Sequence, residues 1–179
     1  MENRDQSIQL LQTYIEGESL LNHSKMVALA MEAYAKHLEK SDSEIEEWWA
    51  AGLLHDLDWE KYPDEHPKKA INDILSKYNY SVNVLNAIKA HAPDRTGKQP
   101  ETEIERYLFA CDELSGFMHA VSLMRPTGFQ GMKVKSVNKK LKTIKFAESV
   151  PRDDISRGAK LIHKELNDHI SFLITVFTD

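Results

Sequence analysis

The sequence predicts an all-α protein, folded as a single-domain helical bundle, and three observations lead to this prediction. Only seven glycines and six prolines occur among the 179 residues, so few positions favour turns. Apolar residues recur mostly at spacings of three and four, which is the period of an amphipathic helix. The alternation of apolar and polar residues that would indicate strands is weak, and a hairpin around Gly128 is the one weak strand prediction.

One domain spanning residues 1–179 is expected, because this length lies within the usual range for a single core. We divide it into a core over 19–120 and a basic loop with C-terminal helices over 121–179. No stretch reaches the ~20 apolar residues that a membrane span needs. The polar N-terminal residues resemble neither a secretory signal nor a transit peptide. A soluble, cytoplasmic protein is therefore expected, whereas the sequence does not predict the oligomeric state.

The first helices of the core are predicted from caps and apolar stripes. Ser19 can cap a helix that runs to about Leu38 and carries His23 on its apolar face. Ser43 and Glu46 have the form of a capping box. They open a second helix, which we expect to end at an adjacent histidine and aspartate.

The helices that follow place two more polar residues near the core. A helix is predicted over about 65–78, and Ser81 can cap another that ends near His91, just before a proline. Apolar residues keep a helical period over 103–120, which places Asp112 inside a helix. His119 follows two turns later on the same helix face and is expected to be a packing residue that approaches Asp112.

The C-terminal third is predicted as a loop over 126–135, a basic helix over 134–147 and a closing amphipathic helix over 157–177. Residues 125–145 carry seven Lys and Arg residues and no acidic one, so this stretch contributes +7 to a net charge of −5 and leaves −12 for the rest. Such a run is either a solvated helix face or a field that attracts an anion. A nucleic-acid partner is not expected, because no aromatic residues interleave with the lysines.

Histidine and aspartate are the candidate metal ligands. Cys111 is the only cysteine, which excludes an intrachain disulfide and a cysteine-based zinc site, and its apolar helical surroundings predict a small core residue. A bound divalent ion lowers the pKa of water and neutralises charge on phosphoryl oxygens, so hydrolysis needs no nucleophilic side chain. The candidate ligand set is His23, His55, Asp56, His66, His91 and Asp112.

The order of these residues resembles the HD superfamily of metal-dependent phosphohydrolases. The pattern spans 20–116 and consists of His23, Leu54-His55-Asp56, His66 followed by Ala70, Ala90-His91, and Cys111-Asp112-Glu113. The resemblance implies a bundle of the HD-domain type with two metals bridged by Asp56. His23, His55 and Asp112 would then hold one metal, and His66 and His91 the other. The C-terminal part is similar to a bacterial and archaeal branch of predicted hydrolases, which implies no particular substrate.

The sequence departs from this family after the His-Asp pair. Several two-metal relatives continue with Ile-Gly-Lys, and the lysine helps to bind phosphate, whereas Leu57, Asp58 and Trp59 stand here. Another cation must then bind the phosphate, and the candidates for substrate binding are Lys61, Lys69, Arg125 and Lys139. The residues expected at the catalytic centre are Asp56, Asp58 and His91. Asp58 is either a ligand-orienting group, a proton relay or a simple turn carboxylate.

The function expected from these observations is a metal-dependent hydrolase, a phosphomonoesterase or phosphodiesterase. Its substrate would be small, phosphorylated and nucleotide-like, and its cofactor one or two divalent ions of Mn, Fe, Zn, Co or Ni. Two alternatives stay open: a di-iron oxygenase of the same superfamily and a non-catalytic metal-binding regulatory module. No membrane partner is expected.

Overall fold

The computed structural model describes residues 2–178, and that range contains helices, turns and no strand. The predicted all-α class is therefore confirmed. The weak hairpin prediction was wrong, because the chain around Gly128 forms tight turns, in which Gly128 and Gly131 adopt φ angles of 55° and 67°. No helix in the described range is long and apolar enough to cross a membrane.

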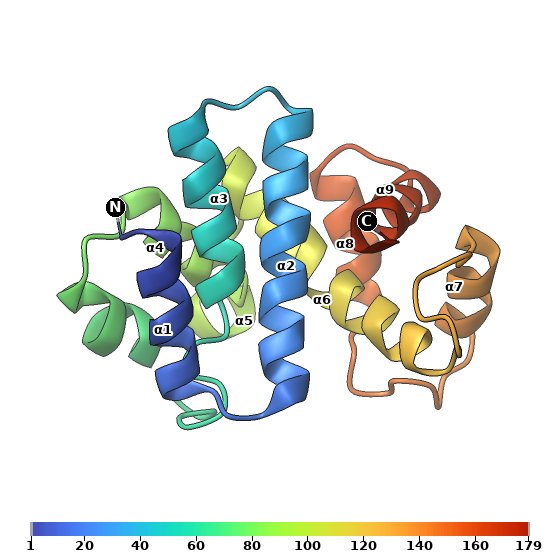
Figure 1. Cartoon of the computed structure of the whole chain (residues 1–179), viewed down its shortest axis with the longest axis horizontal. Helices are drawn as coiled ribbons and strands as arrows, with labels where there is room; N and C mark the ends of the chain where they lie inside the picture. Colours follow the sequence, from blue (N-terminus) through green and yellow to red (C-terminus); the bar gives the residue numbers. More distant parts are fainter. Residues whose placement is uncertain (1, 179) are drawn as a thin grey trace.

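Two antiparallel helices and a third that crosses them form the centre of the bundle (Figure 1). The two antiparallel helices are Glu18–His37 and Asp42–Leu54, and Gly52 allows them to approach closely, since a Cβ at this position would lie only 2.8 Å from the Cα of Ala28. The crossing helix is Glu103–Leu123, and it also packs against Val82–Ala90, whose C-cap is His91. The elements of this part are α1 (Arg4–Tyr14), α2 (Glu18–His37), α3 (Asp42–Leu54), α4 (Val82–Ala90), α5 (Pro93–Thr96) and α6 (Glu103–Leu123).

Three further helices complete the bundle: the second of them packs on α6, and the last packs on α2 and on the other two (Figure 1). They are α7 (Val134–Leu141), α8 (Arg152–Leu161) and α9 (Leu166–Thr178). Gly158 lets α8 approach α6 closely, because a Cβ there would lie 2.7 Å from the Cα of Ala110. The core runs through both parts of the molecule, and Cys111 is fully buried in it, as predicted.

Several predicted helix boundaries differ from the structure. Gly17, not Ser19, is the N-cap of α2, and the capping box of α3 is formed by Ser41 and Glu44, two residues earlier than predicted. The helix α1 was not predicted. The closing helix predicted over 157–177 is two helices, because His163 adopts a φ of 55° and reverses the chain between them.

Two other predicted helices are shorter or irregular for local physical reasons. The basic helix predicted over 134–147 ends at Leu141, consistent with the repulsion between lysines spaced four residues apart along it. The region 65–78 begins with turns and is helical from residue 68 to residue 77, through a π-helical segment, η1 (Ala70–Ile74), and a 3-10 segment, η2 (Leu75–Lys77). The backbone N–H of Ala70 donates to the Asp58 carboxylate instead of continuing a regular helix.

Candidate metal centre

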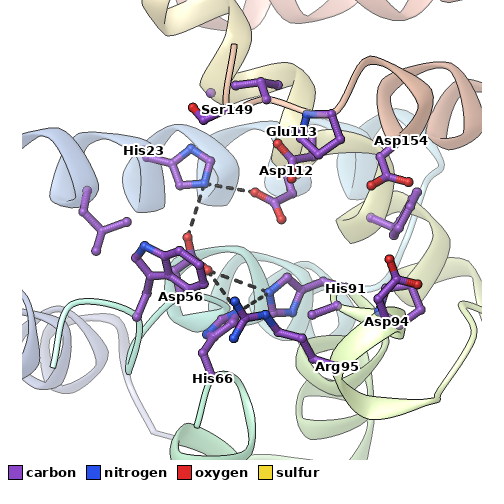
Figure 2. Close-up of a pocket in the computed structure, with 18 of the residues that line it drawn as sticks. His23, Asp56, His66, His91, Asp94, Arg95, Asp112, Glu113, Ser149 and Asp154 are labelled. Atoms are coloured by element: carbon purple, nitrogen blue, oxygen red, sulfur yellow. Dashed lines mark hydrogen bonds and ion pairs between the residues drawn. The ribbon is translucent and has the colours of Figure 1, made fainter. Parts of the chain in front are cut away.

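The six candidate ligands converge in space: five of them line one cavity, and His55 is fully buried beside them (Figure 2). His23 lies in the second turn of α2, and Asp112 lies in the middle of α6. His55 and His91 are the C-cap residues of α3 and α4, so both side chains stand where a helix ends. The other two residues, Asp56 and His66, lie in the turns after α3. The sequence order thus becomes a cluster in space.

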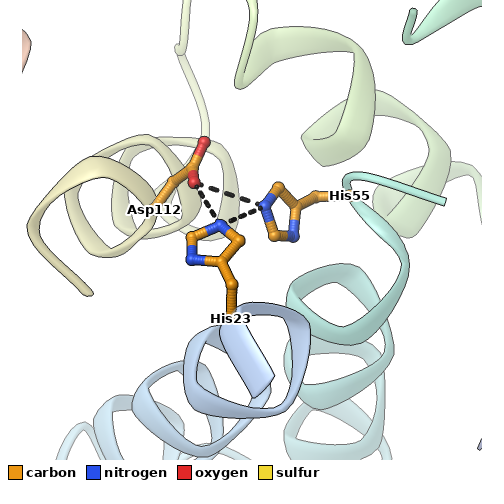
Figure 3. A group of neighbouring side chains, drawn as sticks. All are labelled: His23, His55 and Asp112. Atoms are coloured by element: carbon orange, nitrogen blue, oxygen red, sulfur yellow. Dashed lines mark hydrogen bonds and ion pairs between the residues drawn. The ribbon is translucent and has the colours of Figure 1, made fainter. Parts of the chain in front are cut away.

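His23, His55 and Asp112 form the first ligand group (Figure 3). The Nε2 atom of His23 lies 3.0 Å from Oδ1 of Asp112 and 3.2 Å from Nε2 of His55. The Nε2 atom of His55 lies 3.3 Å from the same carboxylate oxygen. Two nitrogens and one oxygen therefore point at a common position.

Asp56, His66 and His91 form the second ligand group. The Nε2 atoms of His66 and His91 lie 3.1 Å apart, at 3.5 Å and 3.8 Å from Oδ1 of Asp56. The other oxygen of Asp56, Oδ2, lies 3.4 Å from Nε2 of His55 and 3.7 Å from Nε2 of His23. The Asp56 carboxylate thus stands between the two groups, with one oxygen toward each.

The hydrogen bonds of the histidines show that these groups fit a cation. The Nδ1 atoms of His55 and His91 face the carbonyl oxygens of Gly52, at 2.8 Å, and of Ile88. A carbonyl oxygen only accepts, so each Nδ1 carries a hydrogen, and when the ring is neutral its lone pair is at Nε2. Lone pairs at this separation repel one another, and a metal ion bound between them relieves that repulsion.

Asp58 lies behind His66, outside the cavity. Its side chain is fully buried, and Oδ1 accepts a hydrogen bond of 2.7 Å from Nδ1–H of His66. Oδ2 accepts a second bond of 2.7 Å from the backbone N–H of Ala70. Because it does not reach the cavity, Asp58 is not placed to touch a substrate. Of the roles considered for it, the geometry favours the orientation of a ligand.

The charges in the first group attract a positive ion. Burial acts to lower the pKa of His55, but the carboxylates of Asp56 and Asp112 outweigh it and raise that pKa well above its usual value. Burial likewise acts to raise the pKa values of Asp56 and Asp112, and the neighbouring histidines instead hold both below their usual range. Both carboxylates are therefore ionised at neutral pH, as metal ligands must be.

The ligand groups open into a cavity of about 620 Å³. Carboxyl groups are the most frequent charged groups of its wall, with Asp94, Glu113 and Asp154 besides the ligands, and Arg95 also lines it (Figure 2). Burial and the nearby Asp112 and Asp154 carboxylates raise the pKa of Glu113 to about 8. Trp59, Phe109, Val150 and Pro151 supply apolar surface, and His119 lies on the α6 wall, where burial lowers its pKa.

The four residues predicted to bind the substrate do not line this cavity. Lys61 donates to the carbonyl oxygen of Thr13, and Lys69 pairs with Asp73 on the outer surface. Arg125 donates to the carbonyl oxygens of Gly128 and Gln130 within its own loop, and Lys139 is on α7. The first three cations are held by local acceptors, which corrects the prediction that they bind phosphate at this site.

Sequence reasoning missed several residues of the cavity wall. Arg95 follows His91 by four residues, and that nearness along the chain could have drawn attention to it. Asp154 and Ser149 offered no such signal, because they reach the cavity only through the packing of the C-terminal segment on α6.

Comparison with known proteins agrees with this geometry. The family model described as HD domain matches residues 20–116, more than half of the chain, and the protein belongs to this family of metal-dependent hydrolases. A curated relative, Ribonuclease Y of Chlorobium phaeobacteroides (strain DSM 266 / SMG 266 / 2430), is 34% identical over 91 residues. This match covers 50% of the present chain and 17% of that relative. No solved structure matches the chain.

Proposed function

We propose that this protein is a phosphohydrolase that uses one or two divalent metal ions to hydrolyse a small phosphorylated, nucleotide-like substrate. The observation that carries the proposal is the position of the Asp56 carboxylate, with Oδ2 toward His23 and His55 and Oδ1 toward His66 and His91. Six nitrogen and oxygen donors in two adjacent groups suit two transition-metal ions.

The ligand groups define the roles of the chain's own residues. His23, His55 and Asp112 would hold one ion and His66 and His91 the other, with Asp56 shared between them. When bound, the metal supplies a more acidic water and neutralises negative charge on the phosphoryl group. Asp58 fixes the ring of His66 through its hydrogen bond to Nδ1. Glu113 and His119, on the α6 wall, are the titratable groups placed to exchange protons with the substrate.

The size and lining of the cavity support a small substrate. A volume of about 620 Å³ lies within the range of pockets for small molecules. Trp59 and Phe109 give apolar surface on which a base or another planar group can pack. The name of the Chlorobium relative indicates that it cleaves RNA, so a phosphodiester is the second substrate class to test.

An activity screen of purified protein loaded with each candidate metal tests the proposal. Phosphomonoesters, cyclic and linear phosphodiesters and a short RNA serve as substrates, and Asp56→Ala and the exposed Asp64→Asn serve as test and control variants. We expect hydrolysis of a small ester that disappears in Asp56→Ala and persists in Asp64→Asn. Absence of hydrolysis with every metal, or iron-dependent consumption of oxygen instead, would overturn it.

A further inference from the structure

Arg95 differs in charge from every other wall residue of the metal cavity. Within residues 2–178, it is the only lysine or arginine that lines this cavity, and the wall also carries the carboxyl groups of Asp94, Glu113 and Asp154 (Figure 2). Leu57, Asp58 and Trp59 follow Asp56, so no lysine stands directly after the His-Asp pair. The cavity therefore has a single protein cation near its metal ligands.

The guanidinium of Arg95 is held close to the second ligand group. Its Nη1 donates a hydrogen bond of 2.7 Å to the carbonyl oxygen of Pro63. The guanidinium carbon lies 4.9 Å from the centre of the Trp59 ring, and that ring stands edge-on to His66 with 5.0 Å between their centres. Trp59 thus links the arginine to a metal ligand.

The backbone of Arg95 is also fixed relative to His91. The short helix α5 begins with Pro93, two residues after His91. The Thr96 hydroxyl lies 3.0 Å from the carbonyl oxygen of Ala92 and 2.8 Å from that of Lys89, and it holds the turn against the end of α4. Little ordering of this segment is then needed when a ligand binds.

Two nitrogens of this guanidinium have no partner in the described part of the chain. Nε and Nη2 make no hydrogen bond there, and no carboxylate pairs with the group, although acidic residues line the same cavity. A guanidinium presents paired donors that match two oxygens of a phosphate. The free edge of Arg95 is thus a phosphate-binding group beside the proposed hydrolytic centre.

We infer that Arg95 binds the phosphate of the substrate and that the surrounding carboxylates restrict the cavity to substrates with a single phosphate group. The inference rests on the proposed function and adds the substrate class. A second phosphate would lie near the carboxylates of Asp94 and Asp154, where like charges repel it. A polynucleotide, with a phosphate on every residue, is disfavoured for the same reason.

Binding of inorganic phosphate to metal-loaded protein, measured by isothermal titration calorimetry, tests the role of Arg95. We expect Arg95→Ala to weaken phosphate binding by roughly 10- to 100-fold, the usual effect of losing a charged hydrogen-bonding partner. Arg95→Gln should lose as much phosphate affinity. Its amide can still donate to the carbonyl oxygen of Pro63, so the loop should keep its conformation. Arg106→Ala, on the outer part of α6, is the control and should leave the affinity unchanged. Metal content is measured for each variant.

The limit to one phosphate is tested with AMP and adenosine 3′,5′-bisphosphate. The wild type should bind AMP more tightly than the bisphosphate by on the order of 3- to 10-fold, and this difference in affinity should be smaller in Asp154→Asn. Wild-type phosphate affinity in Arg95→Gln, or no phosphate binding by the wild type, would overturn the role of Arg95. Tighter binding of the bisphosphate would overturn the single-phosphate limit. Because these assays measure binding, their failure is distinct from a failure to hydrolyse any ester.

Discussion

Replacement of Asp58 by asparagine tests whether the second ligand group depends on a buried partner. The two carboxylate oxygens of Asp58 accept hydrogen bonds of 2.7 Å each, one from His66 and one from Ala70. Asparagine has the same shape but only one acceptor oxygen. If its amide nitrogen faces His66, the ring must move its hydrogen to Nε2, the atom that points at the proposed metal. If it faces Ala70, a buried N–H loses its acceptor.

The expected size of this effect follows from the loss of one outer hydrogen bond to a metal-binding histidine. Such losses weaken metal affinity by about 10- to 100-fold, or roughly 1.4–2.7 kcal/mol. The loss should fall on the second ligand group only, since the first group does not contact Asp58. In the other orientation the unpartnered N–H costs about 1–3 kcal/mol of folding stability instead.

Competition with a chromophoric chelator, fitted with two sites, measures both affinities. Asp64→Asn is the matched control, because Asp64 is an exposed carboxylate in the same loop. Asp58→Asn should lose affinity at one of the two sites only, or lose stability in urea, while Asp64→Asn behaves as the wild type. A folded Asp58→Asn protein with both affinities and its stability unchanged would refute the assigned role.

Three further predictions concern stability. His169 is buried, with Nδ1 accepting from Tyr34 and Nε2–H donating to the carbonyl oxygen of Ala110, and burial lowers its pKa to about 4. The unfolded chain therefore binds a proton at His169 before the folded one does, so stability is full above about pH 6.5 and falls as the pH drops toward 4. Between pH 7 and pH 4.5, the free energy of unfolding measured with urea should fall by about 2 kcal/mol more in the wild type than in His169→Gln; an equal fall in both proteins would contradict this role of His169. Gly52→Ala should destabilise the fold by roughly 1–3 kcal/mol in the same assay, because its Cβ would press on the backbone at Ala28, and an unchanged or higher stability would show that α2 and α3 can separate freely. Removal of metal with a chelator should lower the melting temperature, and metal added back should restore it; a melting temperature that does not respond would contradict a metal bound to the folded state.

Much of the ligand cluster could be predicted from the sequence, but little of the cavity wall could be. His23 on an apolar helix face, and Asp112 within a helical period, could be placed because regular helices fix the direction of a side chain. His55 and His91 could be placed near helix ends from the caps that open α3 and α4. Spacing along the chain does not show that these residues lie close together in space. Their order, which is shared with the HD superfamily, indicated that they form one cluster.

The rest depended on irregular structure and on packing between distant segments. Lys61 and Lys69 lie close to the ligands along the chain, yet the turns after Asp56 direct both side chains to acceptors elsewhere. Ala70 donates to Asp58 and not to a carbonyl oxygen one turn earlier, and the helix predicted there is shorter and irregular. Asp154 reaches the cavity because Gly158 allows close packing of α8 on α6, which no local pattern predicts.

The central claim is that two adjacent ligand groups hold two metal ions and share Asp56. Elemental analysis of protein purified without chelator and then loaded with excess divalent metal tests this most directly, with the double variant His66→Ala, His91→Ala beside the wild type. The account predicts close to two ions per chain in the wild type and close to one in the double variant. No bound ion in the wild type, or the same content in both proteins, would contradict it.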